Sequence, residues 1–533
     1  MATPVPGPVA RRSPGPRPRS RECDIDTSPI TASAAPPGAR DSVPCDLETA
    51  TVAELSALLD AGTVTAVALT RAYLRRIDAL DVRGPALRSV RCLNPDALAD
   101  AAAADERRAA GETGPMLGIP VLLKDNIDVA GLPTTAGSLA LADSRPAGDA
   151  PLVTRLRVAG AVLLGKTNLT EFANYLTEGM PSGYSSLAGQ VLNPYDLSRT
   201  PSGSSSGSGA AAAAGLAAVT VGTETSGSII SPAAANSLVG VKPTVGLVSR
   251  TGIVPIAASQ DTAGPMARTV ADAAALLTVI AGPDPEDPAT AANPLDGHDF
   301  TADLADGALD GVRLGVVDHE VPAPGSGERV LWDAAMAALT GRGATLVEVA
   351  LPTRTGYDVE SIVLSYEFKR DLNAYLARLP QDAPVRTLAE VIAFNDAHAA
   401  RTLKFGQKMA LAAQQWDVAP DSADSGRYRA ARARDLEGSR GRIDPLLAEQ
   451  GLSALLFVDA EGCDIGAKAG YPSITVPAGY LAAGRAPFNL TFLGPAWSEP
   501  VLIGLAHAFE QATRSRRPPS EVNPTVYGAG LPG

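Results

Sequence analysis

The composition changes abruptly between residues 203 and 227, where serine, glycine and alanine dominate the sequence. A Ser/Gly run alone is typical of a flexible linker. Here it leads into a run of helix-forming alanines, Ala210 to Ala214, and then into a strand-like apolar segment, Ala217 to Val221. We therefore expect this segment to lie inside a core sheet and not between domains.

The rest of the chain alternates short apolar strands with helices, which is typical of an α/β domain. Thr51 and Glu54 predict a capping box at the start of one helix. The expected helices are 51–59, 65–80, 151–159 and 500–514, and the expected strands are 119–123, 162–164, 239–241, 455–458, 474–476 and 489–493. This order predicts an α/β/α sandwich with a large mixed β-sheet as its core.

Composition favours one large domain over residues 46–520, because 45% of the 533 residues are apolar. Residues 1–45 are rich in proline and arginine without an apolar pattern, and we interpret them as a disordered tail. Residues from about 353 to 450 are richer in charge and predict a helical excursion from the sheet. Residues 521–533 are expected to form a flexible C-terminal tail.

A net charge of −13 argues against binding to nucleic acid or to an anionic membrane surface. No run of about 18 apolar residues predicts a membrane-spanning helix. The Arg11-Arg12 pair is not followed by the apolar segment of an export signal, so we expect a cytoplasmic protein. The four cysteines and four histidines are scattered, and they predict neither a disulfide framework nor a metal site.

Residues 160–167 match the phosphate-loop expression G-x-x-x-x-G-K-[ST]. A phosphate loop needs flexible residues between its glycines so that its amides can turn toward the ligand. Here the intervening residues are Ala161, Val162, Leu163 and Leu164, which predict a strand. We therefore do not expect nucleotide binding.

Residues 203–207 match G-x-S-x-G, the expression of a nucleophile elbow, which must follow a strand and requires a histidine elsewhere. The preceding residues 193–202 predict a loop. None of the four histidines lies in a motif that indicates a partner for a catalytic serine. A histidine-dependent triad is therefore not favoured.

A lysine and two turns form a third set of candidate residues. Lys124 ends the apolar segment 119–123, where burial would lower its pKa and allow it to act as a base. The turns at Ser204 and Ser228 consist of small residues, which can expose backbone amides to a developing negative charge. Taken singly, each feature is explained equally well by a surface lysine or a flexible turn.

Taken together, these segments resemble the amidase signature family from about residue 50 to residue 520, and the separation of 24 positions from Ser204 to Ser228 fits that family's spacing. The motifs that carry the resemblance are G-I-P-V-L-L-K-D-N around Lys124, G-K-T-N-L-T-E-F at 165–172, G-S-S-S-G at Ser204, G-T-E-T-S-G-S-I at Ser228, G-V-K-P-T-V-G-L-V-S-R-T-G-I-V-P at 240–255 and S-Q-D-T-A-G-P-M at 259–266. Within the family the likeness is greatest to bacterial peptide amidases, through residues 367–369, 392–395, 470–475 and 496–500.

The resemblance implies a Ser-cisSer-Lys triad in which Ser228 is the nucleophile and forms an acyl-enzyme. Ser204, preceded by a cis peptide bond, would bridge Ser228 to a neutral Lys124 that accepts the proton. The amides of Thr225, Ser226, Gly227 and Ser228 would form the oxyanion hole. The resemblance implies no metal and no organic cofactor.

The sequence departs from the family at three places. Glu224 and Ile230 replace a common Asp and Arg, so an ion pair behind the nucleophile turn is absent. Ser226 replaces the glycine of the wider family and the aspartate usual in peptide amidases. Residues 457–460 replace a loop that contains Pro-Thr in relatives. The second and third departures bear on substrate preference.

The resemblance implies hydrolysis of a carboxamide, either a peptide C-terminal amide or a small apolar amide, to a carboxylate and ammonia. The expected partner is this substrate, and the expected state is a monomer or homodimer. Two alternatives stay open. One is the A-type subunit of a tRNA-dependent amidotransferase, which needs partner subunits. The other is a non-catalytic binding protein on the same scaffold.

Overall fold

The computed structural model describes residues 43–351, 361–481 and 485–527. Its strands are β1 (Val90–Leu93), β2 (Pro120–Lys124), β3 (Val162–Thr167), β4 (Tyr184–Ser185), β5 (Gly189–Gln190), β6 (Val219–Glu224), β7 (Val239–Lys242), β8 (Thr262–Ala267), β9 (Arg313–Val317), β10 (Thr345–Val349), β11 (Ala454–Val458), β12 (Ser473–Tyr480) and β13 (Pro487–Leu493). All but β4 and β5 form one mixed sheet of 11 strands, in the order β1-β3-β2-β6-β8-β7-β12-β13-β11-β9-β10.

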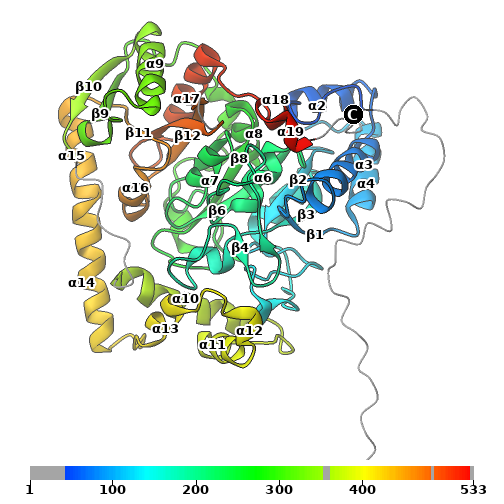
Figure 1. The fold of residues 1–533 in the computed structure, drawn as a ribbon, viewed down its shortest axis with the longest axis vertical. Helices are drawn as coiled ribbons and strands as arrows, with labels where there is room; N and C mark the ends of the chain where they lie inside the picture. Colours follow the sequence, from blue (N-terminus) through cyan, green and yellow to red (C-terminus); the bar gives the residue numbers. More distant parts are fainter. Residues whose placement is uncertain (1–42, 352–360, 482–484, 528–533) are drawn as a thin grey trace, which may run out of the picture.

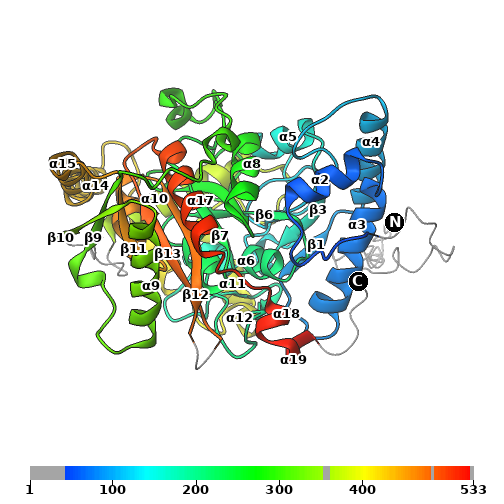
Figure 2. The same cartoon turned by 90° about the horizontal axis from the view of Figure 1, so that it is seen from above.

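Helices lie on both sides of this sheet (Figure 1). They are α2 (Val52–Asp60), α3 (Ala66–Arg76), α4 (Ala97–Ala109), α5 (Pro151–Val158), α6 (Ser206–Ala213), α7 (Ile230–Ala235), α8 (Val270–Ile280), α9 (Gly327–Gly341), α10 (Ile362–Arg378), α11 (Leu388–Ala397), α12 (Ala399–Thr402), α13 (Lys408–Gln414), α14 (Ala423–Gly438), α15 (Arg440–Gln450), α16 (Cys463–Ala469), α17 (Glu499–Thr513), α18 (Pro519–Val522) and α19 (Pro524–Tyr527). Figure 2 shows α2, α3 and α4 at one end of the sheet and α14 and α15 at the other. The predicted α/β/α sandwich with a large mixed sheet is confirmed.

The alternation of side chains along β8 shows how the two faces are filled. Met266 packs with residues of α6 and α7, whereas Ala263 and Ala267 belong to the main core together with α8. A strand directs successive side chains to opposite faces. The helices α6 and α7 therefore lie on the face of the sheet opposite α8.

Three parallel strands determine where the candidate residues lie. The strand β2 pairs in parallel with both β3 and β6. The carboxyl ends of parallel neighbours meet at one edge of a sheet. Lys124 at the end of β2 therefore lies beside Thr223 and Glu224 at the end of β6.

The local predictions hold with shifts at the element ends. The capping box of Thr51 and Glu54 is present at α2. The helix expected over 65–80 ends as an α-helix at Arg76 and continues as a wider π-helical turn, Ile77–Val82. The strand β3 runs through the whole Gly165-Lys166-Thr167 segment, and all of its residues are buried. These residues form a strand and not a phosphate loop.

Residues 361–450 form the helices α10 to α15, which lie within the predicted excursion of about 353–450. Figure 1 shows α10 to α13 at one end of the molecule, with α14 leading back toward β9 and β10. The start of the predicted excursion, residues 352–360, lies outside the described residues. Phe368 and Leu372 on α10 pack against Phe172 and Tyr175. This packing joins the helical segment to the loops at the carboxyl edge of the sheet.

Residues 1–42 of the expected N-terminal tail and residues 528–533 lie outside the described part of the chain. Between these limits, α18 and α19 follow the last long helix. Asn523 is buried and donates from Nδ2 to the carbonyl of Tyr195 at 2.9 Å. Asn523 therefore packs on the fold, although it lies within the segment 521–533 that was expected to form a flexible tail. In the described residues no helix has the length and apolar character that a membrane span requires.

Candidate active site

Lys124 ends the strand β2 with no exposed surface. Its Nζ lies 2.8 Å from Oγ of Ser204, 2.9 Å from Oγ1 of Thr223 and 3.1 Å from the carbonyl oxygen of Thr223. Burial lowers the pKa of Lys124 to about 7, against the opposing effect of the carboxylates of Glu224 and Asp261. Much of the lysine is therefore neutral near neutral pH, as a base requires.

Ser204 is buried in the turn that leads into α6, and the peptide bond between Gly203 and Ser204 is cis. The expected cis bond is therefore present. A side chain at position 203 would come within 2.6 Å of Oγ1 of Thr170, so glycine is needed there. The carbonyl of Ser204 accepts a hydrogen bond from the amide of Thr170 at 3.1 Å. These contacts fix the turn against the end of β3.

Ser228 lies in the turn between β6 and α7. Its carbonyl oxygen accepts from the amide of Ser205 at 3.1 Å, which links the turn of Ser228 to the residue after Ser204. The structure thus brings the two serine turns together at the end of the sheet. Among the described hydrogen bonds, Lys124 is joined to Ser204, but Oγ of Ser204 is not joined to Oγ of Ser228.

Glu224 organises the turn that contains Ser228. Its Oε1 accepts from the amide of Gly227 at 2.7 Å, and its Oε2 accepts from the amides of Ile229 at 2.7 Å and Ile230 at 3.0 Å. The carboxylate therefore compensates orphan amides at the start of α7. This role was missed in the sequence. The signal was present, since an acidic residue before a short helix favours its amino terminus.

The expected oxyanion residues differ in their contacts. The amide of Gly227 already donates to Glu224, whereas the described hydrogen bonds give the amides of Ser226 and Ser228 no acceptor within the protein. The side chain of Thr225 donates to Oδ1 of Asp261. Burial raises the pKa of Asp261 to about 7, although hydrogen bonds from Thr225 and from two backbone amides lower it. Asp261 thus holds the first residue of the turn.

Ser228 opens into a cavity of about 670 Å³. Its lining includes Gly203, Thr225, Ser226 and Gly227 beside apolar side chains. The larger aliphatic side chains of the lining are Met180, Ile256, Leu364 and Met409, and the carboxylates Glu178, Glu461 and Asp464 also line it. A cavity of this size and character is typical of a small-molecule site. Ser226 is part of this lining, which supports a bearing of this residue on substrate preference.

The segment 457–460 reaches the same cavity only at its end. Phe457 is fully buried against Gly462, whereas Ala460 and the neighbouring Glu461 and Cys463 line the cavity. Burial raises the pKa of the Cys463 thiol well above its usual value, so the thiol is protonated at neutral pH. In the described residues no group of three or more His, Cys, Asp or Glu side chains could hold a metal ion.

Comparison with known proteins places this site in a family. Residues 68–460 match the family model Amidase. A probable amidase of Arabidopsis thaliana is 41% identical over 89% of this chain and 92% of its own length. The A-type subunit of the glutamyl-tRNA(Gln) amidotransferase of Chloroflexus aurantiacus is 37% identical over 88% of this chain and 97% of its own length.

Among solved structures, the peptide amidase of Stenotrophomonas maltophilia superposes with a TM-score of 0.84 and 48% sequence identity, over 88% of this chain and 98% of the peptide amidase. The family model and these relatives each cover most of the chain. The chain belongs to the amidase signature family and is an amidohydrolase.

Proposed function

We propose that this protein hydrolyses a carboxamide to a carboxylate and ammonia, with Ser228 as nucleophile and Lys124 as base acting through Ser204. The observation that carries the proposal is the buried Nζ of Lys124, which lies 2.8 Å from Oγ of Ser204 and whose pKa is lowered to about 7 by desolvation. A buried neutral amine beside a serine hydroxyl is a suitable base for activating a second serine.

The contacts of Lys124 match a neutral amine. Such an amine has two N–H donors and one lone pair. When the amine is neutral, its two N–H groups can donate to the carbonyl oxygen and Oγ1 of Thr223, and the proposal assigns the lone pair to the hydroxyl of Ser204. In the proposed reaction Ser228 attacks the amide carbon and passes its proton through Ser204 to Lys124. The same path then returns a proton to the departing amine.

The amides of Thr225, Ser226 and Ser228 are the proposed donors to the oxyanion. Gly227 contributes through the shape of the turn, because its own amide is engaged by Glu224 at 2.7 Å and its φ is +76°. A side chain would be strained at that φ. The carboxylate of Glu224 thereby fixes the turn whose other residues, Thr225, Ser226 and Ser228, line the cavity.

The proposed substrate is a peptide C-terminal amide or a small apolar amide. Its support is the apolar part of the cavity, formed by Met180, Ile256, Leu364 and Met409. It is also supported by the likeness to the peptide amidase, whose structure is known with the competitive inhibitor chymostatin. We also propose a cytoplasmic location and a monomeric or homodimeric state, which rest on the sequence alone.

A substrate panel tests this function. Ammonia release is measured from a peptide amide, an aromatic amide, an aliphatic amide and free glutamine. Labelling by a fluorophosphonate probe is measured in parallel, with Ser228→Ala as control. The proposal expects release from the peptide amide or an apolar amide and labelling that depends on Ser228. Labelling of Ser228→Ala equal to that of the wild type would contradict it.

The 37% identity to the A-type component of an amidotransferase supports a second candidate function. Such a protein would release ammonia from glutamine only together with partner subunits. Glutamine hydrolysis that appears only after the addition of partner subunits would favour this alternative. Failure of the wild type both to release ammonia and to react with the probe would favour a binding protein on this scaffold.

A further inference from the structure

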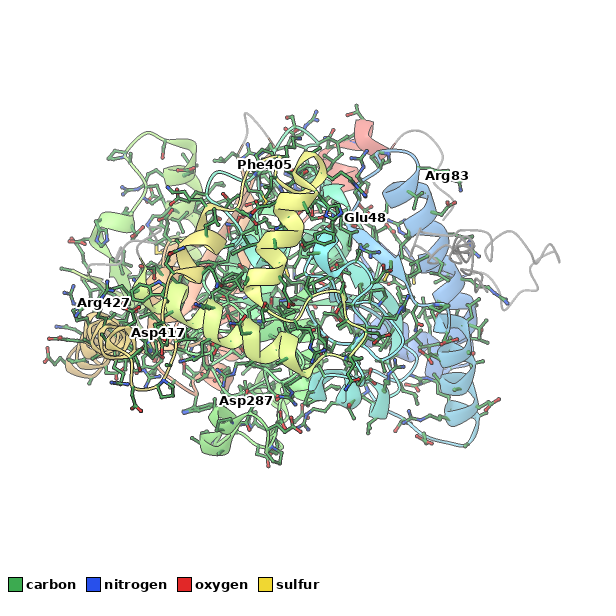
Figure 3. All side chains as sticks on the ribbon, turned by 90° about the horizontal axis from the view of Figure 1, so that it is seen from below. Glu48, Arg83, Asp287, Phe405, Asp417 and Arg427 are labelled. Atoms are coloured by element: carbon green, nitrogen blue, oxygen red, sulfur yellow. The ribbon has the colours of Figure 1, made fainter. Side chains whose placement is uncertain are left out.

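The apolar wall of the cavity at Ser228 belongs to a small hydrophobic core that is separate from the main core of the sheet. All four larger aliphatic residues of the wall pack in this small core; they are Met180, Ile256, Leu364 and Met409. Phe368 on α10 is 1% exposed and lies in the same core. Figure 3 looks onto the helical excursion and labels Phe405 and Asp417, which precede and follow α13. The excursion therefore supplies part of the wall that an acyl group on Ser228 would meet.

Three consecutive residues of α10 each hold a different part of this wall. They are Glu367, Phe368 and Lys369, and none of them is among the residues that line the cavity. Successive side chains of an α-helix point about 100° apart, because a turn contains 3.6 residues. One short stretch of α10 can therefore reach three neighbouring segments.

Phe368 packs against the segment that follows β3. Its ring centroid lies 4.9 Å from that of Tyr175 and 6.2 Å from that of Phe172, both in edge-to-face geometry. Tyr175 lines the cavity, and its hydroxyl lies 3.1 Å from Oγ of Ser365, which is also on α10. Edge-to-face contacts favour one relative orientation of the rings. The helix α10 therefore positions this side of the cavity.

Lys369 holds the end of α13. Its Nζ donates to the carbonyl oxygens of Gln414 at 2.9 Å and Trp416 at 2.6 Å. The last carbonyls of a helix lack partners within the helix and carry partial negative charge, so a cation stabilises them. Because α13 is only seven residues long, a contact at its end also positions Met409 near its start.

Glu367 holds the loop that carries Ile256. It is 1% exposed, and its Oε2 accepts from the amide of Ser259 at 3.0 Å. Its Oε1 accepts from the hydroxyl of Tyr428 on α14. Within the loop, Oδ2 of Asp261 accepts from the amide of Ile256 at 2.9 Å. The loop is therefore fixed both by α10 and by Asp261.

We propose that residues 367–369 determine which acyl groups the enzyme accepts, because they position the apolar wall of the cavity. The inference rests on the proposed function and adds positioning residues to it. The wall selects amides that carry a branched or aromatic apolar side chain next to the carboxamide. Such a side chain leaves water on binding and packs against Ile256, Leu364 and Met409.

Selectivity tests this role more sharply than activity alone. The measured quantity is the ratio of kcat/KM for N-acetyl-leucinamide to that for N-acetyl-glycinamide, which lacks the isobutyl side chain. The wild type should favour N-acetyl-leucinamide about tenfold or more. Lys369→Met keeps a long side chain but removes the N–H donors. It should lower the ratio about fivefold or more, through a higher KM for N-acetyl-leucinamide.

Two further variants are controls for Lys369→Met. Lys369→Arg keeps a cation with N–H donors and should keep the ratio within about twofold. Arg386→Met removes a comparable cation, which donates to the carbonyls of Leu379 and Pro380 after α10 and lies outside the cavity lining. It should also keep the ratio within about twofold, even where the melting temperature falls. An equal loss of selectivity in Lys369→Met and Arg386→Met would overturn the proposal, because selectivity would then follow general stability.

A pair of variants at Glu367 tests the loop independently. Glu367→Gln keeps one acceptor for the amide of Ser259, whereas Glu367→Met removes both acceptors. The ratio should stay within about twofold in the glutamine variant and fall about fivefold or more in the methionine variant. Wild-type selectivity in folded Glu367→Met and Lys369→Met proteins would overturn the proposal.

Binding without turnover separates this inference from the proposed function. Calorimetric titration of both amides gives their Kd for Ser228→Ala and for Ser228→Ala with Lys369→Met. If the wild type hydrolyses neither amide, but Ser228→Ala prefers N-acetyl-leucinamide and the double variant loses that preference, the proposed function fails and the positioning role stands. If the wild type hydrolyses both amides, but without a preference or with one that Lys369→Met leaves unchanged, the positioning role fails and the proposed function stands. Absence of any preference in both hydrolysis and binding would also overturn the positioning role.

Discussion

The Nζ of Lys124 contacts both oxygens of Thr223, the carbonyl at 3.1 Å and Oγ1 at 2.9 Å. The same Oγ1 accepts from Nδ2 of Asn126, so a single hydroxyl accepts hydrogen bonds from both Lys124 and Asn126. Thr223→Val would leave both donors unpaired, at a cost of about 1–3 kcal/mol. We expect kcat/KM to fall about 10–100-fold. Thr220→Val, on the same strand but outside this network, is the control for stability and should keep kcat/KM within a few-fold.

The activity should depend on pH through Lys124. Its pKa is lowered to about 7, and only the neutral amine accepts a proton. We expect log kcat/KM to rise with unit slope below about pH 7 and to level off above it. Thr223→Val removes an acceptor that favours the ammonium form of Lys124, so it should lower the pKa of this lysine. The rising part of the pH profile should therefore move to lower pH. A rate that peaks in acid would contradict a lysine base.

Replacement of the base by arginine separates charge from proton transfer. Lys124→Arg keeps a cation but introduces a guanidinium that does not deprotonate in proteins. We expect kcat to fall by about 10²–10⁴-fold, the usual contribution of a general base. Circular dichroism and the melting temperature check that the variant is folded. A folded Lys124→Arg protein with near wild-type kcat would show that the lysine acts only as a charge.

Glu224 should be required for the nucleophile turn. Its two oxygens accept three amides, and a glutamine offers only one acceptor oxygen. Glu224→Gln should lower the free energy of unfolding by about 1–3 kcal/mol and should also lower kcat. Glu499→Gln is the control for removal of a buried carboxylate, because Glu499 is buried and accepts one amide, that of Thr244, through Oε1, a bond that a glutamine oxygen can keep. It should keep both kcat and the free energy of unfolding close to the wild type, as measured by ammonia release and urea unfolding.

Local sequence patterns predicted the helices and strands but not which of them pack against one another. The apolar run 119–123 and the apolar residues 162–164 identified β2 and β3, because buried parallel strands are continuous apolar runs. The contact of Lys124 with Thr223 arises from the parallel pairing of β2 with β6, across a sequence separation of 99 residues. The local periodicity of the sequence does not show that β2 and β6 pair.

The sequence predicted only part of the candidate site, and the reason is the same. The resemblance located Lys124, Ser204 and Ser228, and the structure places Lys124 against Ser204 and the turn of Ser228 beside Ser205. The role of Glu224 as an acceptor of three amides is local in sequence, whereas the contact of Lys124 with Ser204 depends on how segments 80 residues apart pack together. Such packing is a property of the folded chain.

Ammonia release from a peptide amide by the wild type, Ser228→Ala and Lys124→Ala tests the central claim most directly. If Ser228 is the nucleophile and Lys124 its base, the wild type releases ammonia and both folded variants lose nearly all of that activity. Retention of substantial ammonia release by either folded variant would contradict the Ser228, Ser204 and Lys124 mechanism.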